Sequence, residues 1–111
     1  MKKAYRIKKN SEIEALMKHK QSVGNGFLIL YYHDNEENDH FRFAISVPKK
    51  FGSAVMRNKV KRRIREIIRP LDIRKQVDFF IVVKPKANTL EFLELKEMLF
   101  KIFARAKIIE G

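Results

Sequence analysis

The chain has 111 residues, with 25 Lys and Arg against 13 Asp and Glu, a formal net charge of +12 and a pI near 10.1. It contains no Cys, which excludes disulfides and thiolate metal sites. No apolar run approaches the roughly 20 residues that cross a bilayer, and no apolar signal segment follows the basic N-terminus. We therefore expect a cytoplasmic protein that folds as one domain over residues 1–111 and has no membrane partner.

A basic segment, 1–10, leads into the first predicted helix. Ser11 with Glu14 three residues later forms a capping-box pattern, and Ile13 and Met17 follow at helical spacing. These signals predict a helix over residues 11 to 20.

Two strands are predicted next. The apolar and aromatic run 27–33 has strand character, and 41–47 alternates between apolar and other residues. The acidic, turn-prone stretch 34–39 between them predicts a hairpin loop. The pattern leaves room for a short further strand near 21–23.

The second half of the chain predicts helix, strand and helix. A helical pattern over 57–69 ends before Pro70, because a proline disfavours the α conformation in the residue before it. The nearly continuous apolar run 77–83 predicts a central strand buried on both faces. Thr89 is the predicted cap of the last helix. This order of elements predicts an α+β class, with a two-layer sandwich of helices against one sheet.

The segment 49–69 carries the most specific signal. Eight of the 17 residues from Lys49 to Arg65 are basic and none is acidic. The predicted helix within it has two unlike sides. The apolar side consists of Val60, Ile64, Ile67 and Ile68. The opposite side consists of Asn58, Lys61, Arg62, Arg65 and Arg69.

Such a helix suits a polyphosphate chain. Cations on successive turns can follow phosphates that repeat along a backbone, and the planar guanidinium fork matches phosphate and base edges. Each neutralised phosphate also releases condensed counterions. The segment therefore predicts nucleic-acid binding.

Two other interpretations of this helix fit its composition less well. A solvated surface helix normally mixes charges of both signs, whereas Glu66 is the only acid among seven bases from 57 to 69. A membrane-surface helix favours large apolar residues, whereas the β-branched stripe here suits core packing.

The segment resembles the bacterial ribonuclease P protein family. The pair Arg57-Asn58 is followed by Lys61-Arg62-x-x-Arg65, after a Gly-x-Ala turn at 52–54. The similarity extends over nearly the whole chain. It implies a fold like that of ribosomal protein S5 domain 2, with a left-handed βαβ crossover that chirality rules make rare.

The resemblance also implies function and partners. The family acts with a catalytic RNA, and the two together remove the 5′ leader from precursor transfer RNA. Mg²⁺ is expected to be held mainly by the RNA subunit and the substrate. The expected partners are that RNA and the leader, with no protein partner required.

The motif carries the expected RNA contacts, and the first helix and the sheet carry the leader cleft. The RNA-binding residues implied are Lys49, Lys50, Arg57, Asn58, Lys59, Lys61, Arg62, Arg63, Arg65 and Arg69. The leader cleft implied consists of Ile13, Met17, Tyr31 and Arg42. Tyr31 is equally well explained as an ordinary strand aromatic.

One departure from the family concerns base stacking. Ile13 and Met17 occupy positions where the family commonly has aromatic residues, and they are also compatible with simple core packing. Stacking of an aromatic side chain on a base is worth about 1–3 kcal/mol. We therefore expect the cleft to be present but its stacking on leader bases to be weaker.

No catalytic residue or metal ligand is assigned to the protein itself. His33 and His40 flank the acidic loop and could form an acid–base pair, but that role has little support. The alternative function is a non-catalytic RNA-binding module, such as a ribosomal protein or an RNA chaperone. A protein-only nuclease would need carboxylates arranged to hold metal.

Overall fold

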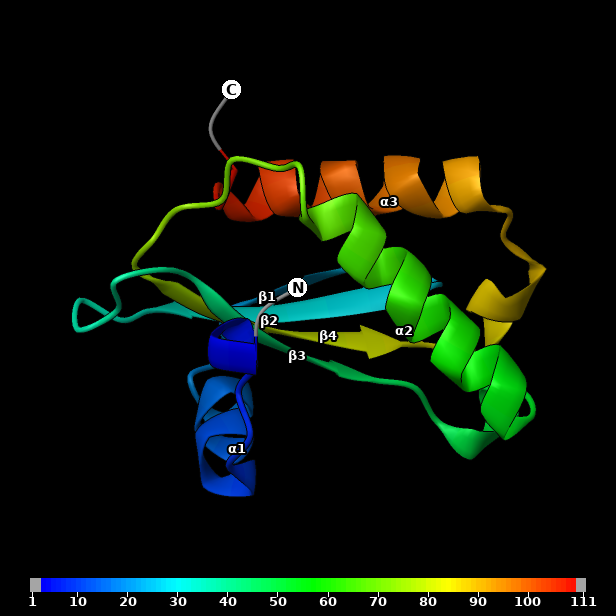
Figure 1. The fold of residues 1–111 in the computed structure, drawn as a ribbon, viewed down its shortest axis with the longest axis horizontal. Helices are drawn as coiled ribbons and strands as arrows, with labels where there is room; N and C mark the ends of the chain where they lie inside the picture. The colour runs from blue at the N-terminus through cyan, green and yellow to red at the C-terminus, as the bar shows by residue number, and fades with distance from the viewer. Residues whose placement is uncertain (1–2, 110–111) are drawn as a thin grey trace.

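The computed structural model describes residues 3–109, which form a mixed four-stranded sheet and three α-helices (Figure 1). The helices are α1 (Asn10–Lys18), α2 (Ala54–Ile68) and α3 (Phe92–Ala106). The strands are β1 (Ser22–Gly24), β2 (Leu28–Asp34), β3 (Arg42–Ser46) and β4 (Val77–Val83). The short strand expected near 21–23 is thus confirmed as β1.

The most apolar strand is central, as predicted. The sheet order is β1-β2-β4-β3, so β4 has a neighbour on both sides. It pairs antiparallel with β2, where Tyr32 lies opposite Phe79, and parallel with β3, where Phe43 lies opposite Phe79. Six of its seven residues are buried, which explains the nearly unbroken apolar sequence of this strand.

The predicted hairpin over 34–39 is wrong. β2 and β3 are not neighbours, because β4 lies between them, and the connecting segment spans the end of β4. Asn35 and Asn38 in this segment donate hydrogen bonds to the carboxylate of Asp78 on β4, at 3.1 and 2.7 Å. Acidic, turn-prone residues between two strands therefore do not distinguish a hairpin loop from a connection that crosses the end of an intervening strand.

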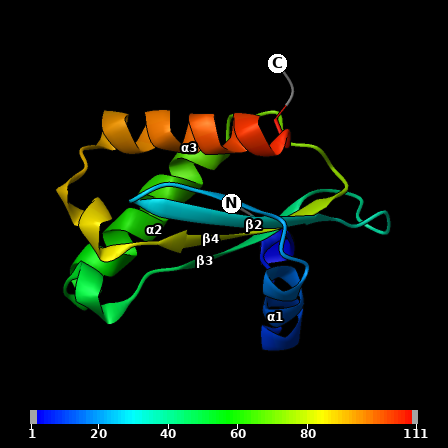
Figure 2. The same ribbon diagram turned by 180° about the vertical axis from the view of Figure 1, so that it is seen from behind.

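The two faces of the sheet are covered unequally (Figures 1 and 2). α2 and α3 cover one face, where Phe79 packs edge-on against Phe103 with 5.5 Å between ring centroids. α1 covers only part of the other face, where Leu16 packs with Ile7 and Phe80. The rest of that second face is left without a helix.

The unit β3–α2–β4 has the left-handed crossover that the resemblance implies. In Figure 1 both strands run toward the right, β3 lies nearer the viewer than β4, and α2 passes above them. A parallel connection of this hand is rare, because strand twist favours the opposite one.

The helix starts differ from the sequence predictions. α2 begins at Ala54, three residues early, where the Ser53 hydroxyl accepts a hydrogen bond from the Met56 amide. α1 begins at Asn10 without a side-chain cap, so the predicted capping box there is wrong. α3 is capped by Glu91 rather than Thr89, in a reciprocal pair with Glu94.

Candidate nucleic-acid interface

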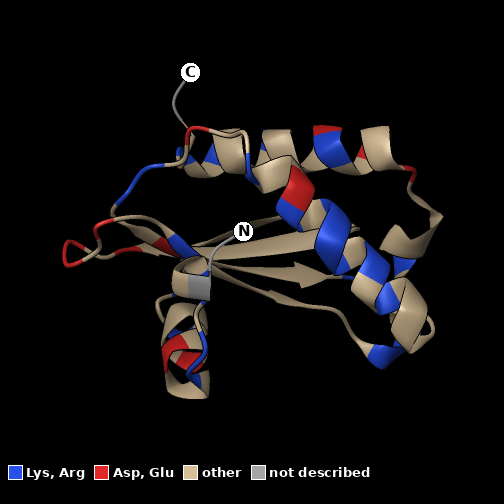
Figure 3. Cartoon of the chain, in the orientation of Figure 1, with Lys and Arg blue, Asp and Glu red and all other residues tan. Residues whose placement is uncertain are grey.

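Helix α2 holds its cations on a rigid base. Its apolar stripe is buried at Val60, Ile64, Ile67 and Ile68. We use the term basic face for two adjoining parts of the α2 surface. One part is opposite to the apolar stripe, and the other lies between that part and β3. The basic face consists of Arg57, Asn58, Lys61, Arg62, Arg65 and the C-cap residue Arg69. Figure 3 shows Lys and Arg along much of this helix, with one acidic segment toward its C-terminal end.

Some residues of the basic face are exposed and others are partly buried. Asn58, Arg62 and Arg69 are exposed, whereas Arg57 and Arg65 are partly covered by neighbouring elements. Lys61 is also partly covered. The expectation that Arg65 points freely into solvent is therefore wrong, because the side chain lies against the N-terminal segment and β3.

No carboxylate neutralises the basic face in residues 3–109. The ion pairs within that range involve only Arg42 and Arg74 as cations. Glu66, the acid on α2, is exposed. The guanidinium charges of α2 are thus available to an external polyanion, which an acid-masked helix would not allow.

The remaining predicted bases lie around the start of α2. Lys49 and Lys50 are exposed on a 3₁₀ turn just before the helix. Lys59 and Arg63 lie on the flank of α2 opposite to β3, at a cavity of about 190 Å³ with an apolar floor that includes Phe51. These two residues therefore face a different direction from the basic face.

The part of the sheet that α1 leaves uncovered carries aromatic side chains next to that helix. Tyr31 from β2 and Phe80 from β4 stack there, with ring centroids 6.2 Å apart and an interplanar angle of 24°. Ile13 on α1 packs against the same cluster, together with Ala44 of β3. Met17, one turn further along α1, is 41% exposed. The structure thus brings Ile13 and Tyr31 into one cluster, whereas Met17 is exposed on the same helix.

Arg42 lies on the other flank of α1 and is already engaged. Its guanidinium binds Asp78 through two hydrogen bonds of 3.1 and 2.7 Å, and a third N–H donates to Glu12 at 3.1 Å. The hydrogen bond to Asp78 raises the pKa of Arg42, against the opposing effect of burial. This arginine ties α1 to β3 and β4, and its contact with RNA stays a prediction.

The histidines do not form an acid–base pair. His33 stacks on His19 with 3.7 Å between ring centroids, whereas His40 stacks on Tyr5 at 4.2 Å. His33 and His40 thus have different stacking partners.

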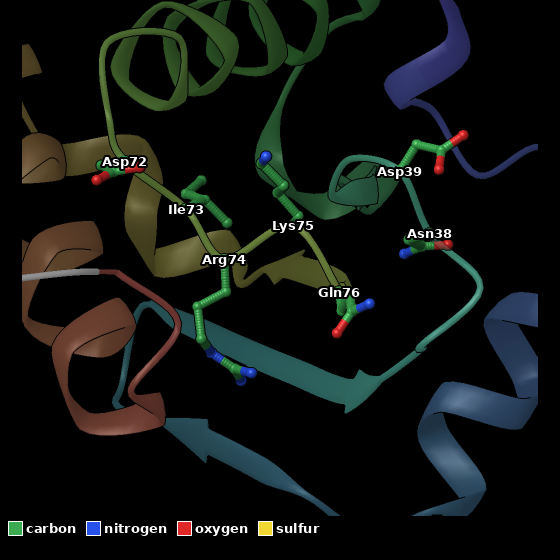
Figure 4. A pocket seen from close by; sticks show the side chains of 7 residues that line it. All are labelled: Asn38, Asp39, Asp72, Ile73, Arg74, Lys75 and Gln76. Atoms are coloured by element: carbon green, nitrogen blue, oxygen red, sulfur yellow. The ribbon is translucent and has the colours of Figure 1, made fainter.

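A cavity of about 580 Å³ is lined by residues 72–76, in the loop before β4, and by Asn38 and Asp39 (Figure 4). Several of its polar side chains already have partners. Arg74 pairs with Asp34 at 3.1 Å and donates to the Lys107 carbonyl, and Gln76 donates to the Glu36 carbonyl. Both acidic and basic side chains line this cavity, so it offers no consistent charge to a nucleic acid.

The carboxylates of residues 3–109 do not fit a magnesium ion. No group of three or more His, Asp or Glu side chains converges there. In Asp78, the most buried carboxylate of these residues, both oxygens accept hydrogen bonds from Arg42, Asn35 and Asn38. Within the same range, no helix has the length and apolar character of a membrane span.

Comparison with known proteins identifies the family. The sequence model of the Ribonuclease P family matches residues 1–107. The chain belongs to the ribonuclease P protein family. A ribonuclease P protein component from Acholeplasma laidlawii is 43% identical over 112 residues, which cover 99% of this chain and 96% of the relative.

Solved structures of ribonuclease P proteins share the fold. The Staphylococcus aureus protein is 38% identical, with a TM-score of 0.88 over 97% of this chain and 100% of that one. The Thermotoga maritima protein is 28% identical, with a TM-score of 0.80 over 96% of this chain and 98% of that one. The fold predicted by resemblance to ribonuclease P proteins is thereby confirmed.

Three residues at or next to the candidate interface were not predicted from the sequence. Phe80 was read only as core, although alternation along β4 places it on the face opposite to Phe79. The role of Asp78 has no local signal, because its hydrogen-bond partners are 36 to 43 residues away in the chain. Arg6 was one cation among several in the basic N-terminal segment, and only the fold brings it to Arg65.

Proposed function

We propose that the chain acts in ribonuclease P by docking the catalytic RNA on the basic face of α2 and the 5′ leader of precursor transfer RNA in the cleft beside α1. The observation that carries this proposal is the set of unpaired cations on a helix whose opposite side is buried. A polyanion binds such a surface without first displacing carboxylates of the described chain.

Rigidity is what makes the basic face useful. Ile64 and Ile68 are fully buried, so α2 cannot turn to relieve repulsion between its arginines. The cations are therefore held in place before RNA arrives, which reduces the ordering cost of binding.

The cleft suits an extended single strand. Its floor carries the stacked pair Tyr31 and Phe80, and its side wall carries Ile13 and Met17. Aromatic and apolar surface accepts unpaired bases with little sequence preference. Because α1 contributes aliphatic rather than aromatic side chains, stacking in this cleft depends on Tyr31.

The protein positions RNA and does not hold the metal. In this proposal Mg²⁺ is bound by the RNA subunit and the substrate, because the described carboxylates offer no converging set. The contribution of the chain is to bring the leader and the catalytic RNA together on adjoining surfaces, which raises the affinity for substrate.

Reconstitution tests the proposal. The protein is mixed with the catalytic RNA of a related ribonuclease P and with precursor transfer RNA at low Mg²⁺, and kcat/KM is measured with and without protein. We expect stimulation, and tighter binding of the precursor than of the mature transfer RNA. Lys101→Ala, at an exposed position on α3, is the control and should behave as the wild type.

The alternative, an RNA-binding module outside ribonuclease P, predicts another result. Such a module would bind RNA with a steep dependence on salt but would leave the rate of cleavage by the catalytic RNA unchanged. Binding without stimulation would therefore favour a ribosomal-protein or chaperone role.

A further inference from the structure

The N-terminal segment extends the sheet at the free edge of β3. Arg6 pairs with Phe43 in a parallel bridge, and the Ile7 amide donates to the Phe43 carbonyl at 2.9 Å. Ile7 itself is buried under α1, next to Leu16. The backbone of Arg6 is therefore held at the edge of β3, although its side chain is exposed.

A cavity of about 190 Å³ lies where this segment, α1, β3 and α2 meet. Its apolar lining consists of Ile7, Ile13, Phe43, Ala44 and Ile45. Its polar lining consists of two side chains, Arg6 and Arg65. The cavity thus contains two cations and no carboxylate.

Arg65 is poorly compensated at this place. Its Nε is buried and has no hydrogen-bond partner within residues 3–109. Burial lowers the pKa of Arg65, and the nearby charge of Arg6 lowers it further. A buried N–H without an acceptor and a neighbouring like charge both cost folding free energy. A bound anion would reduce both costs.

We propose that Arg6 and Arg65 together bind one phosphate group of the RNA backbone. The inference rests on the proposed function for the identity of the polyanion. A phosphate carries enough acceptor oxygens for two guanidinium forks, whereas a single carboxylate is filled by one bidentate arginine. The apolar lining beside the two arginines suits the sugar or base attached to that phosphate.

The location of this pair joins the two proposed RNA surfaces. Arg65 belongs to the basic face of α2, and Ile13 in the same cavity belongs to the wall of the leader cleft. One strand that passes from the cleft to α2 crosses the edge of β3 at this point. Arg6 then holds the strand at the junction.

The free protein gives the first test, with inorganic phosphate as the probe. Unfolding midpoints are measured in phosphate and in chloride at equal ionic strength, for wild type, Arg6→Gln, Arg65→Gln and Arg105→Gln. Arg105 is an exposed arginine on α3, outside both proposed RNA surfaces, so it is the matched control for Arg6. Phosphate stabilises proteins generally, and the control removes that contribution.

The proposal expects a phosphate-specific increase in wild type and in Arg105→Gln, because a ligand that binds only the native state stabilises it. Arg6→Gln should lose that increase, and the double variant Arg6→Gln, Arg65→Gln should lose no more than either single variant. An equal response in all variants would overturn the proposal. Because Arg6 is exposed, its variant can be tested even if Arg65→Gln does not fold.

Reconstituted enzyme gives the second test. Precursors with one uncharged methylphosphonate linkage are compared position by position along the leader. At one linkage, the methylphosphonate should lower the affinity of the wild-type enzyme for the precursor by about tenfold, as expected for the loss of one charge-assisted contact. The same linkage should not lower the affinity of the enzyme that carries Arg6→Gln. Equal losses in both proteins at every linkage would refute the phosphate pair. Stimulation of cleavage by the wild type would still support the proposed function.

Discussion

At the scale of single residues, Asp78 holds the most connected position in the described structure. The side chain is on the α1 face of β4, with 8% of the residue exposed. It accepts hydrogen bonds from Arg42, Asn35 and Asn38, and Arg42 continues the network to Glu12 on α1. One carboxylate therefore joins β3, the loop after β2 and, through Arg42, the helix that forms the wall of the cleft.

The first prediction concerns this network. Asp78→Asn keeps the size of the side chain but removes the charge that Arg42 faces, so the variant should be less stable by about 2–3 kcal/mol. Urea unfolding measures the difference. Asp72→Asn, at an exposed position without an ion pair in the described residues, should stay within about 0.5 kcal/mol of wild type. Equal stabilities of the two variants would contradict the role of Asp78.

The second prediction concerns pH. Burial alone raises the pKa of Asp78, but hydrogen bonds from Arg42, Asn38 and Asn35 outweigh it and leave the pKa below its usual 3.8. The unfolded chain therefore binds this proton at a higher pH than the native protein does. The stabilisation is present above about pH 5 and is lost as the pH falls through the lowered pKa. Urea unfolding between pH 7 and 3 should show wild type and Asp78→Asn converging at the acid end.

The third prediction tests the aliphatic wall of the cleft. Met17→Phe places an aromatic ring one turn from Ile13, on an exposed position that tolerates it. The added stacking should strengthen binding of the leader by up to about 1–3 kcal/mol. Affinities of precursor and mature transfer RNA for the reconstituted enzyme measure this gain, which should affect only the precursor. Ala15→Phe, on the other flank of α1, is the control, and an equal gain there would argue against the cleft.

At the scale of elements, the two sides of α2 have different roles. One side packs in the core, and the proposed function assigns RNA binding to the other. The fourth prediction compares two truncations on this helix. Ile64→Ala should cost about 2–5 kcal/mol in urea unfolding, because Ile64 is fully buried. Arg62→Ala should leave stability within about 0.5 kcal/mol and reduce the slope of log affinity against log salt by about one unit. An unchanged slope would place the RNA on another surface.

The same scale shows what local patterns can predict. The stripe of α2 and the buried run of β4 were predicted correctly, because each depends on spacing within one element. The hairpin over 34–39 was not, because the insertion of β4 between β2 and β3 depends on pairing between residues that lie far apart in the sequence, such as Leu28 with Val83. Arg6 and Arg65 share a cavity for the same non-local reason. The crossover hand came from family resemblance and not from the pattern.

At the scale of the whole molecule, the excess of positive charge favours RNA binding and lowers the stability of the free protein. Figure 3 shows cations along α2 and acids in the loop between β2 and β3, at the opposite end of the sheet from the start of α2. With a formal net charge of +12, the cations of the free protein repel one another, and this repulsion destabilises the folded state. Salt screens that repulsion, since the Debye length falls to about 8 Å at 0.15 M. RNA removes it by neutralisation.

The fifth prediction is that salt acts in opposite directions on folding and on binding. Raising NaCl from low to moderate concentration should raise the unfolding midpoint of the free protein, and a gain of about 1 kcal/mol corresponds to about 4 °C. The same change should weaken RNA binding, with a log–log slope proportional to the number of phosphates contacted. A variant with Arg62 and Arg69 changed to Ala carries two fewer exposed positive charges, so both dependences should be shallower. If salt destabilised the free protein, or if the variant kept both slopes, self-repulsion along α2 would not be the origin of the effect.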